Sequence, residues 1–287
     1  MVLHVGAHKT ATTHFQQALR RGRRGFERAG ATLYTPLELR HGPKLPERLG
    51  ISYKLRKLRD SWSPGLLSEM AEGRPRLVIS EENVMGQMSG ASGQHAASLY
   101  PEAEARVATL AMGVAPLPLT LFLTIREPAS YLVSAYSQSL LGGFGKGFER
   151  FVARIPPHAV DWCDLVRRLL TVPRVGEVVV WRKEDYPEVA FQAADGLAGA
   201  RIARPFWFSH KPLHEGLSAP AAAAALEAPV GKARATAAEA ARKRFPISAG
   251  HPRLRPFDGE LEALAAEYYA AQWQRLAAMP RVRLIRP

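Results

Sequence analysis

The sequence predicts an α/β protein in which a central, mostly parallel sheet is flanked by helices. Short apolar runs recur along the chain, and each precedes polar residues and a segment with helically spaced apolar residues. The runs are Val2–Val5, Leu77–Ser80, Leu119–Ile125 and Gly176–Trp181. The length of 287 residues suits one large domain, so we expect residues 1–287 to form a single unit.

Each element follows from local signals. Thr12 and Thr13 can cap a helix whose apolar residues continue to Ala29, with Gly30 as its stop. Residues 35–64 are irregular and basic, which is typical of an insertion that faces a substrate. From Ala219 the chain is alanine-rich and helical in pattern, with an interruption at Pro229. A final amphipathic helix is predicted over residues 261–279.

Composition excludes several classes of protein. The chain is 47% apolar and 23% charged, which rules out a disordered protein. Its best apolar stretch, Ala111–Ile125, contains two prolines and is shorter than the roughly 20 residues that a membrane span needs. The strand pattern at Val2–Val5 argues against a secretory signal, and the single cysteine, Cys163, cannot form an internal disulfide. We therefore expect a cytoplasmic protein without a membrane span.

The chain is strongly basic. Thirty-nine Lys and Arg residues against 26 Asp and Glu residues give a formal net charge of +13. Such an excess favours an anionic partner, which leaves nucleic acid, a membrane surface and a phosphorylated small molecule as candidates.

The loop after the first predicted strand has the features of an anion site. Its sequence, GAHKTATTHF, runs from Gly6 to Phe15 and leads from a strand into a helix. Backbone N–H groups at a helix N-terminus bind anions, and Lys9 adds a positive charge beside the hydroxyl groups of three threonines. No glycine directly precedes Lys9, so the loop departs from the GxxxxGK[ST] pattern of ordinary ATPases and GTPases.

A second candidate segment follows the third apolar run. Arg126 comes directly after this predicted strand, Pro128 suits a first helical turn, and Ser134 lies within the helix. A guanidinium and a hydroxyl so placed can converge on one phosphate. The alternative is that Arg126 caps the sheet edge and Ser134 is structural.

Together the two segments resemble the sulfotransferases that use 3′-phosphoadenosine 5′-phosphosulfate (PAPS), particularly their bacterial carbohydrate and Golgi-type branch. HVGAHKTATT resembles the 5′-phosphosulfate loop of this family, commonly GxxKTGTT, with Ala11 where glycine is usual. The segment Phe122–Leu140 resembles its 3′-phosphate motif. Residues 178–187 and 210–226 are similar to a late strand and to a C-terminal loop of the branch.

The resemblance implies a P-loop-like sulfotransferase fold, PAPS as co-substrate, PAP as product and no metal. It places Arg126 and Ser134 at the 3′-phosphate, and it brings Lys211 near the nucleotide. The residues that it assigns to the 5′-phosphosulfate loop are His8, Lys9, Thr10, Ala11, Thr12 and Thr13.

Four residues are candidates for catalysis. Lys9 is expected to neutralise the bridging oxygen as it leaves, since transfers of this kind depend on positioning and charge stabilisation. Glu81 and Glu82 stand at a predicted strand end, and the resemblance to the family, which often has Ser-Glu here, favours Glu81 after Ser80 as the general base that accepts the proton of a hydroxyl acceptor. Its rivals are Glu82 and, in the basic insertion, His41.

The function expected from these residues is transfer of a sulfuryl group from PAPS to a carbohydrate, lipid or small alcohol. A nucleotide-dependent kinase on a P-loop-like core is the alternative enzyme, although no acidic partner for Mg²⁺ stands out. A basic nucleic-acid-binding protein is the alternative from another class, but no recognised binding signature accompanies the charge, so no specific nucleic acid is expected. The acceptor and the oligomeric state stay open.

Overall fold

The computed structural model describes residues 1–40, 65–88, 98–145, 147–153, 156–202 and 216–287. Helices and strands alternate along much of this chain, as the sequence predicts. The strands are β1 (Val2–His4), β2 (Ala31–Tyr34), β3 (Arg76–Ser80), β4 (Leu119–Ile125), β5 (Val175–Arg182) and β6 (Val282–Leu284). The helices that pack against them or extend beyond them are α1 (Thr12–Arg21), α2 (Arg23–Arg28), α3 (Pro36–Arg40), α5 (Leu66–Ala71), α6 (Ala103–Gly113), α7 (Pro128–Leu141), α8 (Phe148–Val152), α9 (Trp162–Thr171), α10 (Tyr186–Ala198), α11 (Ala219–Glu227), α12 (Lys232–Arg244) and α13 (Gly259–Ala278).

Within the described residues, the strands form one sheet in the order β2-β3-β1-β4-β5-β6, and every pairing in it is parallel. The prediction of an α/β fold with a mostly parallel sheet is therefore confirmed. From the central strand β1 the chain passes to the edge strand β2 and returns through β3, which pairs with β1. It then crosses to β4 on the other side of β1 and continues through β5 to the opposite edge at β6. The carboxyl ends of β1 and β4 thus lie side by side at the point where the strand order reverses, which is where ligands bind in open α/β sheets.

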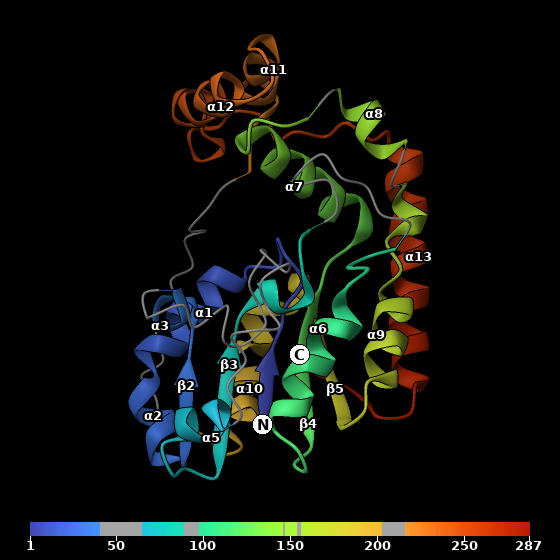
Figure 1. Cartoon of the computed structure of the whole chain (residues 1–287). Helices are drawn as coiled ribbons and strands as arrows, with labels where there is room; N and C mark the ends of the chain where they lie inside the picture. The colour runs from blue at the N-terminus through green and yellow to red at the C-terminus, as the bar shows by residue number, and fades with distance from the viewer. Residues whose placement is uncertain (41–64, 89–97, 146, 154–155, 203–215) are drawn as a thin grey trace.

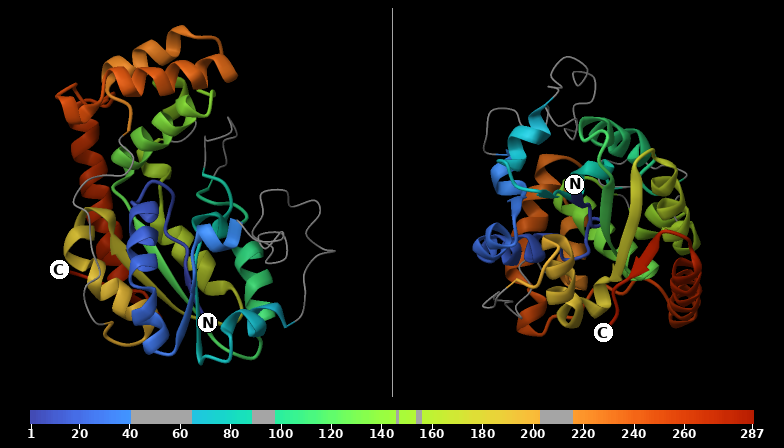
Figure 2. Two further views of the ribbon diagram at one scale, coloured as in Figure 1. Left: turned by 90° about the vertical axis from the view of Figure 1, so that its left-hand side faces the viewer. Right: turned by 90° about the horizontal axis from the view of Figure 1, so that it is seen from below.

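Both faces of the sheet are covered by helices, as Figures 1 and 2 show. Leu3 lies opposite Ile79 and Leu121 in the register, and all three belong to the core that α6, α7 and α9 cover. The alternate residues face a second core formed with α1, α2 and α10, which includes Phe15 and Phe122. Because both faces are buried, the central strands read as continuous apolar runs.

The structure corrects three local expectations. The first predicted helix is divided at Gly22 into α1 and α2, and no side chain caps the start of α1 at Thr12. The insertion predicted to be irregular begins with the helix α3, while residues 41–64 lie outside the described residues. Strands β2 and β6 were not anticipated, because each is only three or four residues long and follows directly on a helix.

Beyond the carboxyl edge of the sheet, α7 extends to contact α11 and α12, which cross above it in Figure 1. The predicted break at Pro229 is the turn between these two helices. Among the described helices, none has the length and apolar character to span a membrane.

Candidate functional site

A cavity of about 1380 Å³ lies at the carboxyl edge of the sheet. Its walls come from the loop after β1, the η2 turn (a 3-10 helix, Glu82–Met85) after β3, one side of α7 along its whole length, and α12 with the loop that follows it. The volume exceeds the 300–1,000 Å³ of an ordinary small-ligand pocket.

The loop after β1 leads the start of α1 into this cavity. Ala11, Thr12 and Thr13 line it, and the N-terminus of α1 carries no side-chain cap. The first turn of a helix has unsatisfied backbone N–H groups, and the helix dipole makes them attractive to an anion. A ten-residue helix with its uncapped start in a basic cavity is therefore suited to hold a phosphate or sulfate group.

The backbone of this loop is strained at two places. Lys9 and Ala11 both have φ of 66°, in the left-handed region that disfavours side chains. Gly6 permits the tight packing beneath them, because a Cβ there would lie 2.5 Å from Cγ2 of Thr12 and 3.0 Å from Nε2 of His4. Strain of this kind persists at ligand-binding sites when the surrounding structure holds it in place.

Replacing Ala11 by glycine should therefore stabilise the protein. The left-handed conformation costs alanine about 1–2 kcal/mol, and glycine avoids this cost. Glycine also makes the unfolded chain more flexible, which lowers stability by about 0.4–1 kcal/mol and offsets part of the effect. We expect Ala11→Gly to raise the free energy of unfolding, measured by urea denaturation. Ala270→Gly, at an exposed position inside α13, is the matched control and should lower it by about 1 kcal/mol. A loss of stability in both variants would contradict the account of strain at Ala11.

Lys9 and Arg126, which the sequence places 117 residues apart, are in direct contact. Nη1 of Arg126 donates to the carbonyl oxygen of Lys9 at 2.8 Å, and its Nε donates to Oγ of Ser130 at 2.9 Å. The guanidinium thus braces the backbone of the strained loop while lining the cavity. Nζ of Lys9 donates to Oε1 of Gln138 on α7 at 3.1 Å, so both cations are held at the switch point of the sheet.

Charge is concentrated around these two residues. Burial, together with the charges of Arg126 and Arg242, lowers the pKa of Lys9 to about 8. Burial likewise lowers the pKa of Lys183, and the charges of Arg126 and Arg253 add to this. Arg126 therefore lies between two groups of cations, one with Lys9 and one with Lys183.

The remaining residues of the loop have distinct positions. Thr12 and Thr13 line the cavity, but Thr10 is buried and its hydroxyl donates to the carbonyl of Ala7, so Thr10 braces the loop and does not line it. Ser134 lines the cavity from α7. His41 and Lys211 lie outside the described residues.

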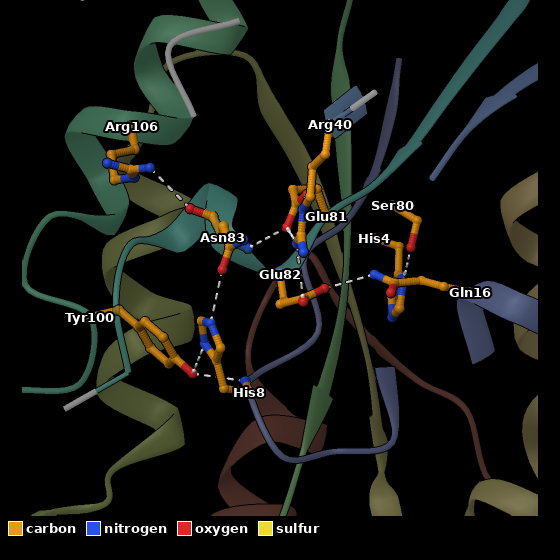
Figure 3. A network of polar contacts seen from close by, with 10 residues as sticks. All are labelled: His4, His8, Gln16, Arg40, Ser80, Glu81, Glu82, Asn83, Tyr100 and Arg106. Atoms are coloured by element: carbon orange, nitrogen blue, oxygen red, sulfur yellow. Dashed lines mark hydrogen bonds and ion pairs between the residues drawn. The ribbon is translucent and has the colours of Figure 1, made fainter. Parts of the chain in front are cut away.

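His8 lines the cavity as a neutral, fully paired ring. Its Nδ1 and its backbone N–H both contact the hydroxyl of Tyr100, and its Nε2 lies 3.1 Å from Oδ1 of Asn83. The amide oxygen can only accept, which assigns the proton to Nε2. Burial lowers the pKa of His8, in agreement with a neutral ring. His8 therefore ties the loop to the η2 turn, as Figure 3 shows.

The two carboxylates after β3 have different surroundings. Glu81 is buried, accepts from the backbone N–H of Asn83, and binds Arg40 through both carboxylate oxygens. Glu82 lines the cavity, and its Oε2 accepts from Nε2 of Gln16 at 2.7 Å. Because Glu81 is outside the lining and Glu82 is part of it, the geometry favours Glu82 over Glu81 as the group that meets a substrate.

Sequence reasoning missed several residues of the cavity. Lys183 follows the end of β5, so the rule that ligands bind at the carboxyl ends of parallel strands could have found it. Gln16 donates to Glu82 from behind the cavity wall, and it was missed because a glutamine on a helix carries no signal of its own. Arg242 and Arg253 come from a distant part of the chain, which no local pattern connects to the loop. Within the described part of the chain, no cluster of three or more His, Cys, Asp or Glu side chains could hold a metal ion.

Comparisons with known proteins add little to this geometry. No protein-family model matches the chain, and no curated protein matches it. The crystal structure of a sulfotransferase from Alicyclobacillus acidocaldarius is similar to it at 14% sequence identity and a TM-score of 0.44. That match covers 74% of this chain and 86% of the other. A likeness of this extent bears on neither the activity nor the substrate of the present chain.

Proposed function

We propose that this protein transfers a sulfuryl group from PAPS to a hydroxyl group of an acceptor, with PAP as the second product. The observation that carries the proposal is the contact between Arg126 and the backbone of Lys9 inside one basic cavity. The two residues belong to the two sequence segments that resemble the phosphate-binding motifs of PAPS-dependent sulfotransferases. Their meeting supports a single nucleotide bound by both.

The distribution of charge supports two anion sites for this nucleotide. Lys9 and the open start of α1 suit the 5′-phosphosulfate, with Thr12 and Thr13 as hydroxyl donors. Arg126 with Ser134 suits the 3′-phosphate, and Lys183 and Arg253 extend that site beyond the sequence prediction. Mutual repulsion among these cations is relieved when phosphate groups bind between them.

The same geometry supports a role for each residue in an in-line displacement. An acceptor oxygen forms a bond to sulfur while the bond from sulfur to the bridging phosphate oxygen breaks, and the electron pair stays on that oxygen. Lys9 stabilises the charge that develops there. The acceptor proton passes to a carboxylate, for which we propose Glu82 because it lines the cavity. Among the other candidates, Glu81 is bound to Arg40 through both carboxylate oxygens, and His41 lies outside the described residues.

Binding of adenosine 3′,5′-bisphosphate tests the proposal directly. We expect calorimetry to give micromolar affinity for this nucleotide, and we expect it to raise the melting temperature by mass action. Adenosine 5′-monophosphate, which lacks the 3′-phosphate, should bind more weakly. Binding of ATP with Mg²⁺ in preference to the bisphosphate would favour the kinase alternative. No binding of the bisphosphate at millimolar concentration would remove the proposed function.

The affinity for the bisphosphate should fall as the pH rises through about 8. Lys9 has its pKa lowered to about 8 in the ligand-free protein, so it is charged below this pH and neutral above it. A bound anion favours the charged form and raises this pKa, which means that binding above pH 8 must also take up a proton. Calorimetry between pH 7 and about pH 9.5 measures the slope. Lys9→Arg is the control, because a guanidinium keeps its charge over this range. An equal decline in both proteins would assign the pH dependence to another group.

A further inference from the structure

One arginine stands between two carboxylates at the end of β3, in the network of Figure 3. Nη2 of Arg40 lies 2.6 Å from Oε1 of Glu81, and Nε of Arg40 lies 3.0 Å from the second oxygen of Glu81. The same Nη2 lies 3.4 Å from Oε1 of Glu82. Glu81 therefore holds Arg40 by a two-point contact, and Arg40 reaches Glu82 by a single, longer one.

Glu82 is held from two sides. Gln16 donates to its Oε2 from α1, the helix that begins at the strained loop. Arg40 approaches its Oε1 from α3. The side chain of Glu82 is 15% exposed and lines the cavity, whereas that of Glu81 is 2% exposed and does not. One oxygen of Glu82 is thus anchored to the helix at the phosphosulfate loop, and the other is only weakly engaged.

The arrangement is more than an ion pair that stabilises the fold. Glu81 alone satisfies Arg40 with the planar, two-point geometry that a guanidinium prefers. A second carboxylate beside the first is repelled by it, and this repulsion lowers stability. A role in function would explain why Glu82 stands there. Arg40 contacts both carboxylates, so its positive charge favours the ionised form of Glu82 at the cavity wall.

The groups that face Glu82 come from several elements. They are His4 on β1, His8 in the loop, Glu81 after β3, Arg40 on α3 and Tyr100 before α6. Burial favours the protonated form of Glu82, but the hydrogen bonds from Gln16 and from its own backbone, together with the charge of Arg40, lower its pKa. Arg40 is the permanent cation in this set, because a guanidinium does not lose its proton in proteins.

We propose that Arg40, held by Glu81, is a positioning residue that keeps Glu82 ionised and fixed at the cavity wall as the proton acceptor. The role of Glu82 in the reaction rests on the proposed function. The electrostatic action of Arg40 on Glu82 does not, and it can be measured in the protein without a ligand.

The test is the pKa of Glu82 followed by NMR in protein with ¹³C-labelled glutamate carboxyl groups, with Glu82→Gln to assign the signal. We expect Arg40→Met to raise this pKa, and Arg40→Lys, which keeps a cation, to restore most of the wild-type value. Arg40→Gln is a second neutral variant that must behave as Arg40→Met does. Arg283→Met is the matched control, because Arg283 pairs with Glu177 outside the cavity at 2.9 Å. An unchanged pKa in both neutral variants, or an equal rise in the control, would overturn the proposal.

A second measurement separates this proposal from the proposed function. With PAPS as donor and water as acceptor, we expect the acid limb of the turnover profile to move to higher pH in Arg40→Met, while PAP affinity changes less than in Lys9→Ala. A structural role alone would lower the melting temperature without moving that limb. If PAP binds to none of these proteins, including the wild type, the proposed function fails while the NMR result still decides the action of Arg40.

Discussion

Replacement of Lys9 by alanine is expected to abolish measurable sulfuryl transfer. The ammonium group lines the cavity and is held by Gln138 of α7, and in the proposed function it stabilises charge on the leaving phosphate oxygen. Removing one preorganised donor of this kind typically lowers turnover by about 10²–10³-fold. The measurement is release of PAP from PAPS in the presence of a pool of glycan and alcohol acceptors, with initial rates at saturating donor.

The matched control for this variant is Lys183→Ala. Lys183 is another lysine of the cavity wall, but it neighbours Arg126 and Arg253 on the side proposed for the 3′-phosphate. We expect its loss to weaken PAP binding and to leave turnover at saturating donor close to that of the wild type. Near-native turnover in Lys9→Ala, or an equal loss of turnover in both variants, would remove Lys9 from the chemical step.

The architecture was predictable because strands buried on both faces consist of continuous apolar residues, which can be recognised in the sequence. The central strands are covered on both faces, so the predicted run Leu119–Ile125 coincides with β4 and the predicted run at Leu77–Ser80 differs from β3 by one residue. Strand β6 carries no such mark, because its three residues include the charged Arg283 and lie at the sheet edge. The break at Gly22 was also missed, because the apolar spacing continues across it into α2.

The candidate site was predictable where a motif determines the local structure. Lys9 follows from a strand–loop–helix segment, Arg126 follows from a residue directly after a strand, and parallel strands bring the two ends to one edge. The choice between Glu81 and Glu82 could not be made from sequence. Both residues follow the strand and both reach the same nitrogen of Arg40, and which of them meets the cavity depends on Arg40 and Gln16, which approach from other elements.

The loss of Arg126 should remove the ability of the protein to recognise a 3′-phosphate. Its guanidinium contacts Ser130 and the backbone of Lys9 and lies among Lys183 and Arg253, and no other cation of the described residues makes the same contacts. Hydrogen bonds to charged groups contribute about 1.5–3 kcal/mol, which corresponds to roughly 10- to 100-fold in affinity. We expect Arg126→Ala to lower the affinity for adenosine 3′,5′-bisphosphate by this factor, and that for adenosine 5′-monophosphate by less. Calorimetry with both nucleotides gives the ratio of affinities, and Arg283→Ala, outside the cavity, should leave that ratio unchanged. A ratio of affinities in Arg126→Ala equal to that of the wild type would mean that Arg126 does not bind the 3′-phosphate. The proposed function would then lose the observation on which it depends.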